Sequence, residues 1–171
     1  MPLTLVDGYN LLHASGVFGE VRGARGLESS RTALLDHVAD LLGDRAGRVL
    51  VVFDAARAPD GLPGRITHRG IRVWFAREYP DADSLIEEIL EEERAPSEVT
   101  VVSNDRRLQA AARRRRAKAV SSDAWLADIR RAGRPRAGEG HAAPDAKPPE
   151  PAPGEIEHWK RHFGLDDPPR P

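Results

Sequence analysis

Cysteine is absent from the 171 residues of the sequence. Its absence excludes a disulfide framework, cysteine-ligated zinc, iron–sulfur clusters and catalysis by a thiol. Long apolar runs are also missing, and none approaches the roughly 18 residues that a membrane-spanning helix needs. The chain opens directly on the strand-like stretch PLTLVD, with no leader of the signal-peptide type. We therefore expect a cytoplasmic protein with no membrane partner.

A strong net charge is absent as well. The 26 basic and 27 acidic residues leave a formal net charge of -1, so overall charge does not identify a nucleic-acid-binding protein. Hydrophobic residues make up 40% and charged residues 31% of the chain, which is typical of a soluble globular protein. Any basic surface must therefore be local, and any acidic cluster must stand on a nearly neutral background.

The composition changes near Gly133. Proline, glycine, alanine and charged residues dominate from there to residue 154, and such a segment cannot bury enough apolar surface to offset the entropy of ordering it. Further on, Ile156, Trp159 and Phe163 fall at helical spacing and predict a short amphipathic helix, although an unanchored tail fits nearly as well. We predict a folded domain at residues 1–132, a linker at 133–154 and a flexible C-terminal tail at 155–171.

Residues 1–132 alternate between β-rich runs and stretches with apolar side chains at helical spacing. This spacing predicts helices over residues 27–43, 81–94, 106–116 and 121–133. The β-rich runs predict strands over residues 3–6, 48–54, 70–76, 98–105 and 117–120. Continuous β-branched runs between helices are typical of a parallel sheet covered on both faces. We therefore predict an α/β fold, a three-layer α/β/α sandwich with a central parallel sheet.

Aspartates stand where three of these strands end. Asp7 ends the first in LTLVD, Asp54 ends the second in VLVVFD, and Asp105 follows the fourth in VTVVSND. The carboxyl ends of parallel strands meet at one edge of a sheet, and ligands of open α/β sheets bind in the crevice beyond that edge. A fourth candidate for this edge is Asp83, in the first turn of the helix that follows Pro80.

Each aspartate alone has an ordinary explanation as a helix cap or a turn residue. Together they would repel, since two carboxylates about 4 Å apart repel by roughly 4 kcal/mol at an effective dielectric constant near 20. A bound cation removes that cost, and oxygen ligands favour Mg²⁺ or Mn²⁺. The matching chemistry is hydrolysis of a phosphodiester. The sequence has no P-loop, no GxGxxG motif, no Ser-His-Asp spacing and no HExxH motif.

Arginines close to these aspartates favour a nucleic acid as substrate, because they would hold phosphates beside an acidic site. The candidates found in this way are Arg57, Arg65, Arg69, Arg106 and Arg107. The alternative is that they only solvate the surface of an arginine-rich chain. Tyr9, Trp74 and Tyr79 are candidates for stacking on bases, although a tryptophan on a strand fits the core better.

Five stretches carry a resemblance to a known family. They are LVDGYNLLHA, LESSRTALL, VVFDA, ADSLIEEI and SNDRRLQ. In this order and at these spacings they resemble the YacP-like branch of the NYN domains, which are bacterial relatives of PIN-type nucleases. The resemblance covers residues 3–131 and implies a PIN-like fold with metal-dependent ribonuclease activity.

The resemblance also implies roles for single residues. It makes Asp7, Asp83 and Asp105 the ligands of one or two Mg²⁺ or Mn²⁺ ions. Asn10 of the DGYN motif is then expected to position water or phosphate, with Asp54 in a supporting catalytic role. The LExxR helix places Arg31 as a contact to phosphate or to a site carboxylate.

Further acidic residues match no motif. PIN nucleases often carry an acidic residue on the first long helix, for which Asp36 and Asp40 are the candidates here. Asp123, after the last strand, is either an outer ligand or a helix cap.

We predict a metal-dependent endoribonuclease that acts in RNA processing or decay and leaves a 5′-phosphate and a 3′-hydroxyl. RNA is the expected partner, and the family suggests the ribosome or the RNA-decay machinery as others. One alternative is an RNA- or ribosome-binding module with weak or no catalysis. A second is a DNA-directed nuclease of the PIN or flap type. A phosphatase is a third, but its DxD pair is missing because GYN follows Asp7.

Overall fold

The computed structural model describes residues 3–16, 24–55 and 63–133. Its strands are β1 (Leu3–Asp7), β2 (Val49–Phe53), β3 (Arg65–His68), β4 (Ile71–Phe75), β5 (Val99–Val102) and β6 (Lys118–Val120). Its α-helices are α1 (Gly8–Ser15), α2 (Ala24–Leu42), α3 (Ala82–Glu92), α4 (Arg106–Arg114) and α5 (Ser122–Gly133). Two short 3-10 helices, η1 (Gly43–Arg48) and η3 (Pro96–Glu98), precede β2 and β5.

The described strands form one sheet in the order β3-β4-β2-β1-β5-β6. All neighbouring pairs are parallel except β3 and β4, which are antiparallel. The α/β prediction is therefore confirmed, but the sheet is mixed rather than purely parallel. The strand that sequence reasoning missed, β3, has only four residues, none of them fully buried, so it carries no apolar run. It pairs through a tight turn at Arg69 and Gly70, both with positive φ, which suits a two-residue hairpin.

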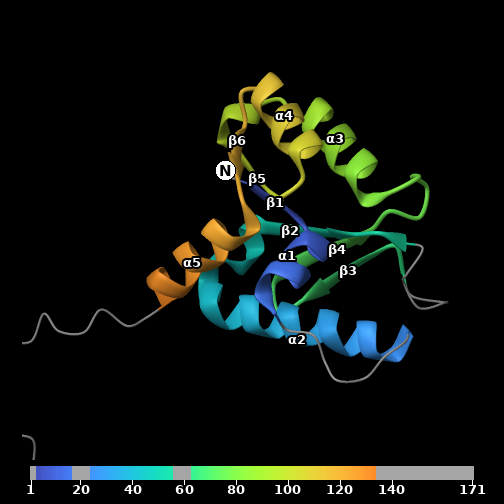
Figure 1. Ribbon diagram of the computed structural model, residues 1–171, viewed down its shortest axis with the longest axis vertical. Helices are drawn as coiled ribbons and strands as arrows, with labels where there is room; N and C mark the ends of the chain where they lie inside the picture. Colours follow the sequence, from blue (N-terminus) through green and yellow to red (C-terminus); the bar gives the residue numbers. More distant parts are fainter. Residues whose placement is uncertain (1–2, 17–23, 56–62, 134–171) are drawn as a thin grey trace, which may run out of the picture. The chain divides into compact units, whose positions relative to one another are not determined.

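Helices cover both faces of the sheet (Figure 1). The helices α3 and α4 pack on one face, and α1, α2 and α5 pack on the other. Adjacent residues of β1 show how the strands serve both layers: Leu5 belongs to the core under α3 and α4, and Val6 to the core under the other three helices. Every residue of β2 is buried, as expected of a central parallel strand. This confirms the three-layer sandwich.

The segment directly after β1 forms a helix, α1. Asp7 caps α1 by accepting a hydrogen bond of 3.1 Å from the backbone N–H of Asn10, and Gly8 is the first helical residue. A Cβ on Gly8 would lie 2.4 Å from the Phe53 ring. Glycine is therefore required here for the close approach of the Phe53 ring.

The last described helix, α5, ends at Gly133, and the predicted division into domain, linker and tail stays a prediction. The rest of the predicted linker, the tail and Arg57 lie outside the described residues. In the part of the chain that the structure describes, no helix combines the length and apolar character needed to cross a membrane.

Candidate active site

The carboxyl edge of the sheet holds the first of the predicted site residues. Asp7 pairs in register with Val52 of β2, and its neighbour Val6 pairs with Val102, the last residue of β5. Ser103 follows that residue directly, so the register brings it level with Asp7. Asp7 is only 4% exposed and Ser103 is fully buried. Strand register thus brings residues 96 positions apart in the sequence into contact at this edge.

The Asp7 carboxylate is held by hydrogen bonds from two elements. Its Oδ1 accepts from the backbone N–H of Asn10, and its Oδ2 accepts from the Asn10 side-chain amide. The Ser103 hydroxyl also donates to Oδ2, at 3.0 Å. The orientation of this carboxylate is therefore fixed before any ligand binds. Asn10 lies where the motif predicted it, although it contacts the carboxylate itself.

Ser103 links the first carboxylate to the second. Its hydroxyl oxygen accepts a hydrogen bond of 3.0 Å from the backbone N–H of Asp105. Asp105 in turn caps α4, with its Oδ1 accepting from the backbone N–H of Arg107 at 2.5 Å. Sequence reasoning missed this role of Ser103. The signal available was its place between the strand end and the helix cap in the SND stretch.

The third carboxylate, Asp83, lies in the first turn of α3 and is half-buried. Burial raises the pKa of Asp83 to about 6, and nearby negative charges act in the same direction. Those charges belong, in decreasing order of effect, to Asp7, Asp105 and Asp81. The structure therefore brings the three predicted ligands close enough for their charges to interact.

The cap of α3 is Asp81. Its Oδ1 accepts a hydrogen bond of 2.7 Å from the backbone N–H of Ser84, and hydrogen bonding from Ser84 lowers the pKa of Asp81. Two aspartates, Asp81 and Asp83, stand at the start of this helix. Because Asp81 fills that position, Asp83 has no capping role that would explain its place among the other carboxylates.

The donor set suits a hard divalent cation in chemistry and in charge. Carboxylate oxygens are the ligands that Mg²⁺ and Mn²⁺ prefer, and a cation would relieve the repulsion that raises the pKa of Asp83. In residues 3–16, 24–55 and 63–133, however, no three acidic or histidine side chains converge tightly enough to hold an ion. The fit is therefore one of donor chemistry rather than of preformed coordination geometry.

Two further predicted residues lie at the same edge. Asp54 directly follows β2 and is half-buried, which places it beyond the register position of Phe53. Arg106 is the first residue of α4 and is exposed. Both positions agree with the predicted neighbourhood, while their supporting and RNA-binding roles stay predictions.

Arg107 faces the acidic residues from α4. Its guanidinium pairs with the Glu87 carboxylate through contacts of 3.0 and 2.8 Å, which raises the pKa of Arg107. Its positive charge acts on Asp83 in the direction opposite to the carboxylates. The side chain is exposed, so a phosphate would compete with Glu87 for it.

Arg31 lies inside the protein, contrary to the prediction that it contacts RNA phosphate, while the alternative contact to a site carboxylate stays a prediction. Its side chain is 3% exposed, and its guanidinium carbon lies 5.8 Å from the centre of the Phe53 ring and 5.5 Å from that of Phe75. Its Nη1 donates to the Tyr9 hydroxyl at 3.2 Å. Tyr9 also packs edge to face against Phe53, with ring centres 5.3 Å apart. Through these contacts Arg31 holds the DGYN segment against α2.

The opposite, amino edge of the sheet holds Arg69, contrary to its predicted place near the acidic site. It lies in the turn before β4, and β4 runs parallel to β1 and β2, so its start is at the amino edge. Arg69 pairs with Asp40 at 2.6 Å, and His68 contacts Asp36 at 2.8 Å. The acidic candidates on α2 are therefore excluded from the Asp7 site in this structure.

Asp123 helps to fix the start of the last described helix, α5. Its Oδ2 accepts a hydrogen bond of 3.0 Å from the Asn104 side-chain amide, whose own oxygen accepts from the backbone N–H of Ser122 at 2.9 Å. Asn104 thus ties the end of β5 to the start of α5. This contact gives Asp123 a structural role, whereas the sequence left open whether it is an outer ligand or a helix cap.

A family model described as "YacP-like NYN domain" matches residues 4–148. The curated protein YacP of Bacillus subtilis (strain 168), described as uncharacterized, is 34% identical over 89 residues. That match covers 52% of this chain and 51% of the relative, so it spans about half of each protein. The family predicted from the five sequence stretches is therefore confirmed.

Two crystal structures of Rae1 (YacP) from Bacillus subtilis, one of them of a mutant, have the same fold. The mutant gives a TM-score of 0.62 and the other structure 0.63, each at 23% identity. Both matches cover 97% of this chain, and they cover 86% and 83% of the respective Rae1 chains. At this identity the likeness establishes the fold.

Proposed function

From the premise that the chain belongs to the YacP-like NYN domain family, we propose that it is a metal-dependent endoribonuclease. The observation that supports the proposal is the placement of Asp7, Asp83 and Asp105 at the carboxyl edge of the sheet, where Asp83 is half-buried and feels the charges of the other two. Asp7 and Asp105 also cap α1 and α4, but Asp83 caps no helix, so its burial beside two carboxylates favours a functional role.

In this proposal Asp7, Asp83 and Asp105 hold Mg²⁺ or Mn²⁺. When bound, the cation supplies Lewis-acid stabilisation of the phosphate and makes water a stronger nucleophile. The protein's own groups prepare the site, because Asn10 and Ser103 fix the Asp7 carboxylate through hydrogen bonds.

In this proposal the exposed arginines at the carboxyl edge bind the RNA substrate. Arg106 and Arg107 lie on the first turn of α4, beside the Asp105 cap, and their charges suit the phosphates on either side of the scissile bond. Hydrolysis is expected to leave a 5′-phosphate and a 3′-hydroxyl. RNA processing or decay is the proposed setting, with the ribosome or the RNA-decay machinery as proposed partner.

The direct test is cleavage of an end-labelled single-stranded RNA in Mn²⁺, in Mg²⁺ and in EDTA. We expect the wild type to cut with either ion and not in EDTA, and Asp7→Asn to be inactive. Asparagine is a good helix cap, so this variant keeps the start of α1 while removing the charge. Asp40→Asn is the matched control, since that aspartate lies at the opposite edge, and it should cut like the wild type.

Two outcomes would contradict the proposal. Cutting by Asp7→Asn at the wild-type rate would place the chemistry elsewhere or in a contaminant. A folded wild type that binds RNA but cuts none with either ion would favour the binding module. A DNA oligonucleotide of the same sequence separates ribonuclease from DNA-directed nuclease activity.

A further inference from the structure

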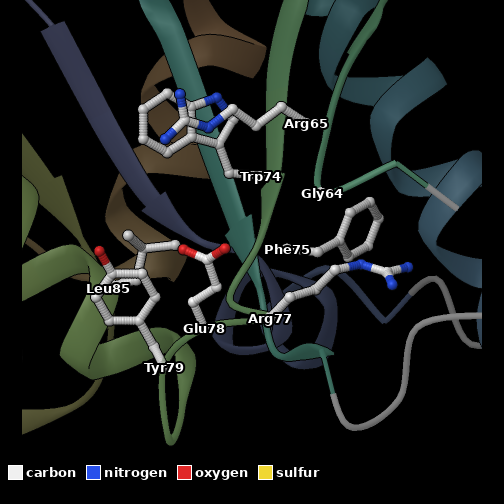
Figure 2. Close-up of a pocket in the computed structure, with 8 residues that line it drawn as sticks. All are labelled: Gly64, Arg65, Trp74, Phe75, Arg77, Glu78, Tyr79 and Leu85. Carbon is white, nitrogen blue, oxygen red and sulfur yellow. The ribbon is translucent and has the colours of Figure 1, made fainter.

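A pocket lies where β4 ends and β3 begins (Figure 2). Its volume is about 340 Å³, within the range of small-ligand sites, and its lining includes Arg65, Trp74, Arg77, Glu78 and Tyr79. Two arginines and three aromatic residues line this one pocket, in a chain with only 5% aromatic residues. Aromatic faces and guanidinium groups are the surfaces on which nucleic-acid bases stack.

The first wall of the pocket is a preassembled flat surface. Arg65 and Trp74 are directly opposite one another in the β3–β4 pairing, so their side chains emerge on the same face. The guanidinium carbon lies 4.0 Å from the centre of the indole ring. Figure 2 shows the guanidinium lying over the indole. Because this stack exists without a ligand, a base that joins it would need little further ordering of these side chains.

The second wall is the Tyr79 ring, which is held from its far end. The Tyr79 hydroxyl donates to a carboxylate oxygen of Glu88 on α3 at 2.5 Å. Glu78 lies near enough for its charge to raise the pKa of Tyr79 together with that bond. In Figure 2, Glu78 extends toward the side where Trp74 and Tyr79 lie, and Arg77 extends toward Phe75. The pocket therefore has a hydrogen-bond acceptor, the Glu78 carboxylate, on the side of Trp74 and Tyr79, and a positive charge, on Arg77, on the side of Phe75.

A short segment of the chain connects this pocket to the acidic site. The loop after β4 contributes Arg77 and Tyr79 to the pocket, and it continues into α3, whose first turn carries Asp83. A second hollow shares Arg65, Trp74 and Tyr79 and runs along α3, but glutamates line it. Those carboxylates would repel a phosphate backbone. A nucleic-acid strand seated in the pocket is therefore directed toward the carboxyl edge of the sheet.

We propose that this pocket is a subsite for one base of single-stranded RNA, next to the scissile phosphate. The base stacks between the Arg65–Trp74 pair and Tyr79, and Glu78 accepts a hydrogen bond from an amino group on its edge. Arg77 binds an adjoining phosphate. Single-stranded RNA is the substrate class, since a base paired in a helix cannot enter such a pocket. That the ligand is RNA rests on the proposed ribonuclease function, whereas the location of the subsite rests on the pocket.

The test measures binding in EDTA, where no cleavage occurs. The probes are a fluorescent single-stranded RNA octamer and a set of octamers that each carry one abasic position. For the wild type we expect one abasic position to weaken binding by about tenfold, the usual effect of a lost base–aromatic stack. Tyr79→Leu and Arg65→Ala should remove that dependence, and Tyr79→Phe should keep it because it retains the ring.

The matched control is Arg48→Ala, which removes an exposed arginine before the start of β2, at the amino edge. It should keep the dependence on the abasic position, which separates a specific subsite from a general loss of positive charge. Tm measurements on every variant verify folding. Equal binding of all abasic octamers by the wild type would overturn the subsite, as would unchanged discrimination in folded Tyr79→Leu.

Cleavage assays with Mn²⁺ distinguish this proposal from the proposed function. A wild type that cuts RNA without any base-specific loss in the abasic series supports the nuclease and overturns the subsite. A wild type that shows the base dependence in EDTA but never cuts supports the subsite and contradicts the nuclease.

Discussion

The two edges of the sheet place acidic side chains in opposite electrostatic environments. At the amino edge, Asp36 and Asp40 of α2 face His68 and Arg69, and hydrogen bonding from His68 lowers the pKa of Asp36. At the carboxyl edge, burial and neighbouring carboxylates raise the pKa of Asp83 to about 6. At the first edge Asp40 is exposed, Asp36 is partly exposed, and both contact basic side chains, whereas the acids at the second edge are buried or partly buried and grouped with one another.

This difference is a criterion for distinguishing structural aspartates from functional ones. A paired surface acid stabilises its surroundings slightly and tolerates replacement. A group of carboxylates that repel one another beyond what helix capping and nearby cations account for favours a functional role, such as the binding of a cation. The helix α2 runs from one edge of the sheet to the other. Its Arg31 packs near the carboxyl ends of β2 and β4, and its Asp36 and Asp40 contact the turn before β4 at the amino edge.

The largest expected contrast is in catalysis. Asp105→Asn should lower the rate of RNA cleavage by at least about a hundredfold, since it removes a charge from the site while asparagine still caps α4. Asp36→Asn should leave the rate unchanged. Single-turnover cleavage of end-labelled RNA measures both. A comparable loss in the two variants would mean that the two edges do not differ in function.

A smaller contrast is expected in the pH dependence of stability. The pKa of Asp83 is raised in the folded state, so this carboxyl favours folding at low pH, and the advantage is lost as pH rises through about 6. Asp83→Asn in metal-free buffer should therefore be more stable than the wild type at pH 8, by about 1 kcal/mol once solvent screening of a half-buried group is allowed for. The difference should vanish between about pH 6 and pH 4.

Denaturant unfolding at pH 4, 6 and 8 measures this effect. A variant that is less stable than the wild type at pH 8 would mean that Asp83 forms stabilising contacts and is not under repulsion. Equal stability differences at all three pH values would show that the carboxyl does not titrate in this range.

The smallest effect is expected at the amino edge. Arg69→Ala removes the contacts to Asp36 and Asp40, which are exposed ion pairs. Such pairs contribute little, so Tm should fall by no more than about 3 °C, and less at high salt. Thermal unfolding at low and high ionic strength measures it. A large, salt-independent fall would show that the turn contributes to folding in another way, for instance through its positive φ angles.

Much of the fold followed from local sequence pattern. Apolar runs and helical spacing predicted β1, β2, β4, β5 and β6 and four of the five described α-helices. The exceptions have physical reasons. The edge strand β3 is too short and too exposed to leave an apolar run, and α1 begins at a glycine that looks like a turn until the Phe53 ring is known to lie against it.

The site was predictable where strand order determines position, and unpredictable where side-chain packing does. Asp7 and Asp105 follow neighbouring parallel strands, so topology alone brings them together. The burial of Arg31 and the pairing of Arg69 depend on the path of α2 across the sheet, which no short motif encodes. Ser103 escaped notice because a serine between a strand and a cap is common, and its two hydrogen bonds appear only in three dimensions.

The most direct test of the contrast between the edges is a titration with Mn²⁺, followed by electron paramagnetic resonance of the free ion. The wild type and an Asp36→Asn/Asp40→Asn double variant should bind Mn²⁺ with the same affinity. Asp83→Asn should bind at least about tenfold more weakly, since it removes a proposed ligand. Unchanged affinity in folded Asp83→Asn, or a loss of binding in the amino-edge double variant, would contradict a cation site at the carboxyl edge.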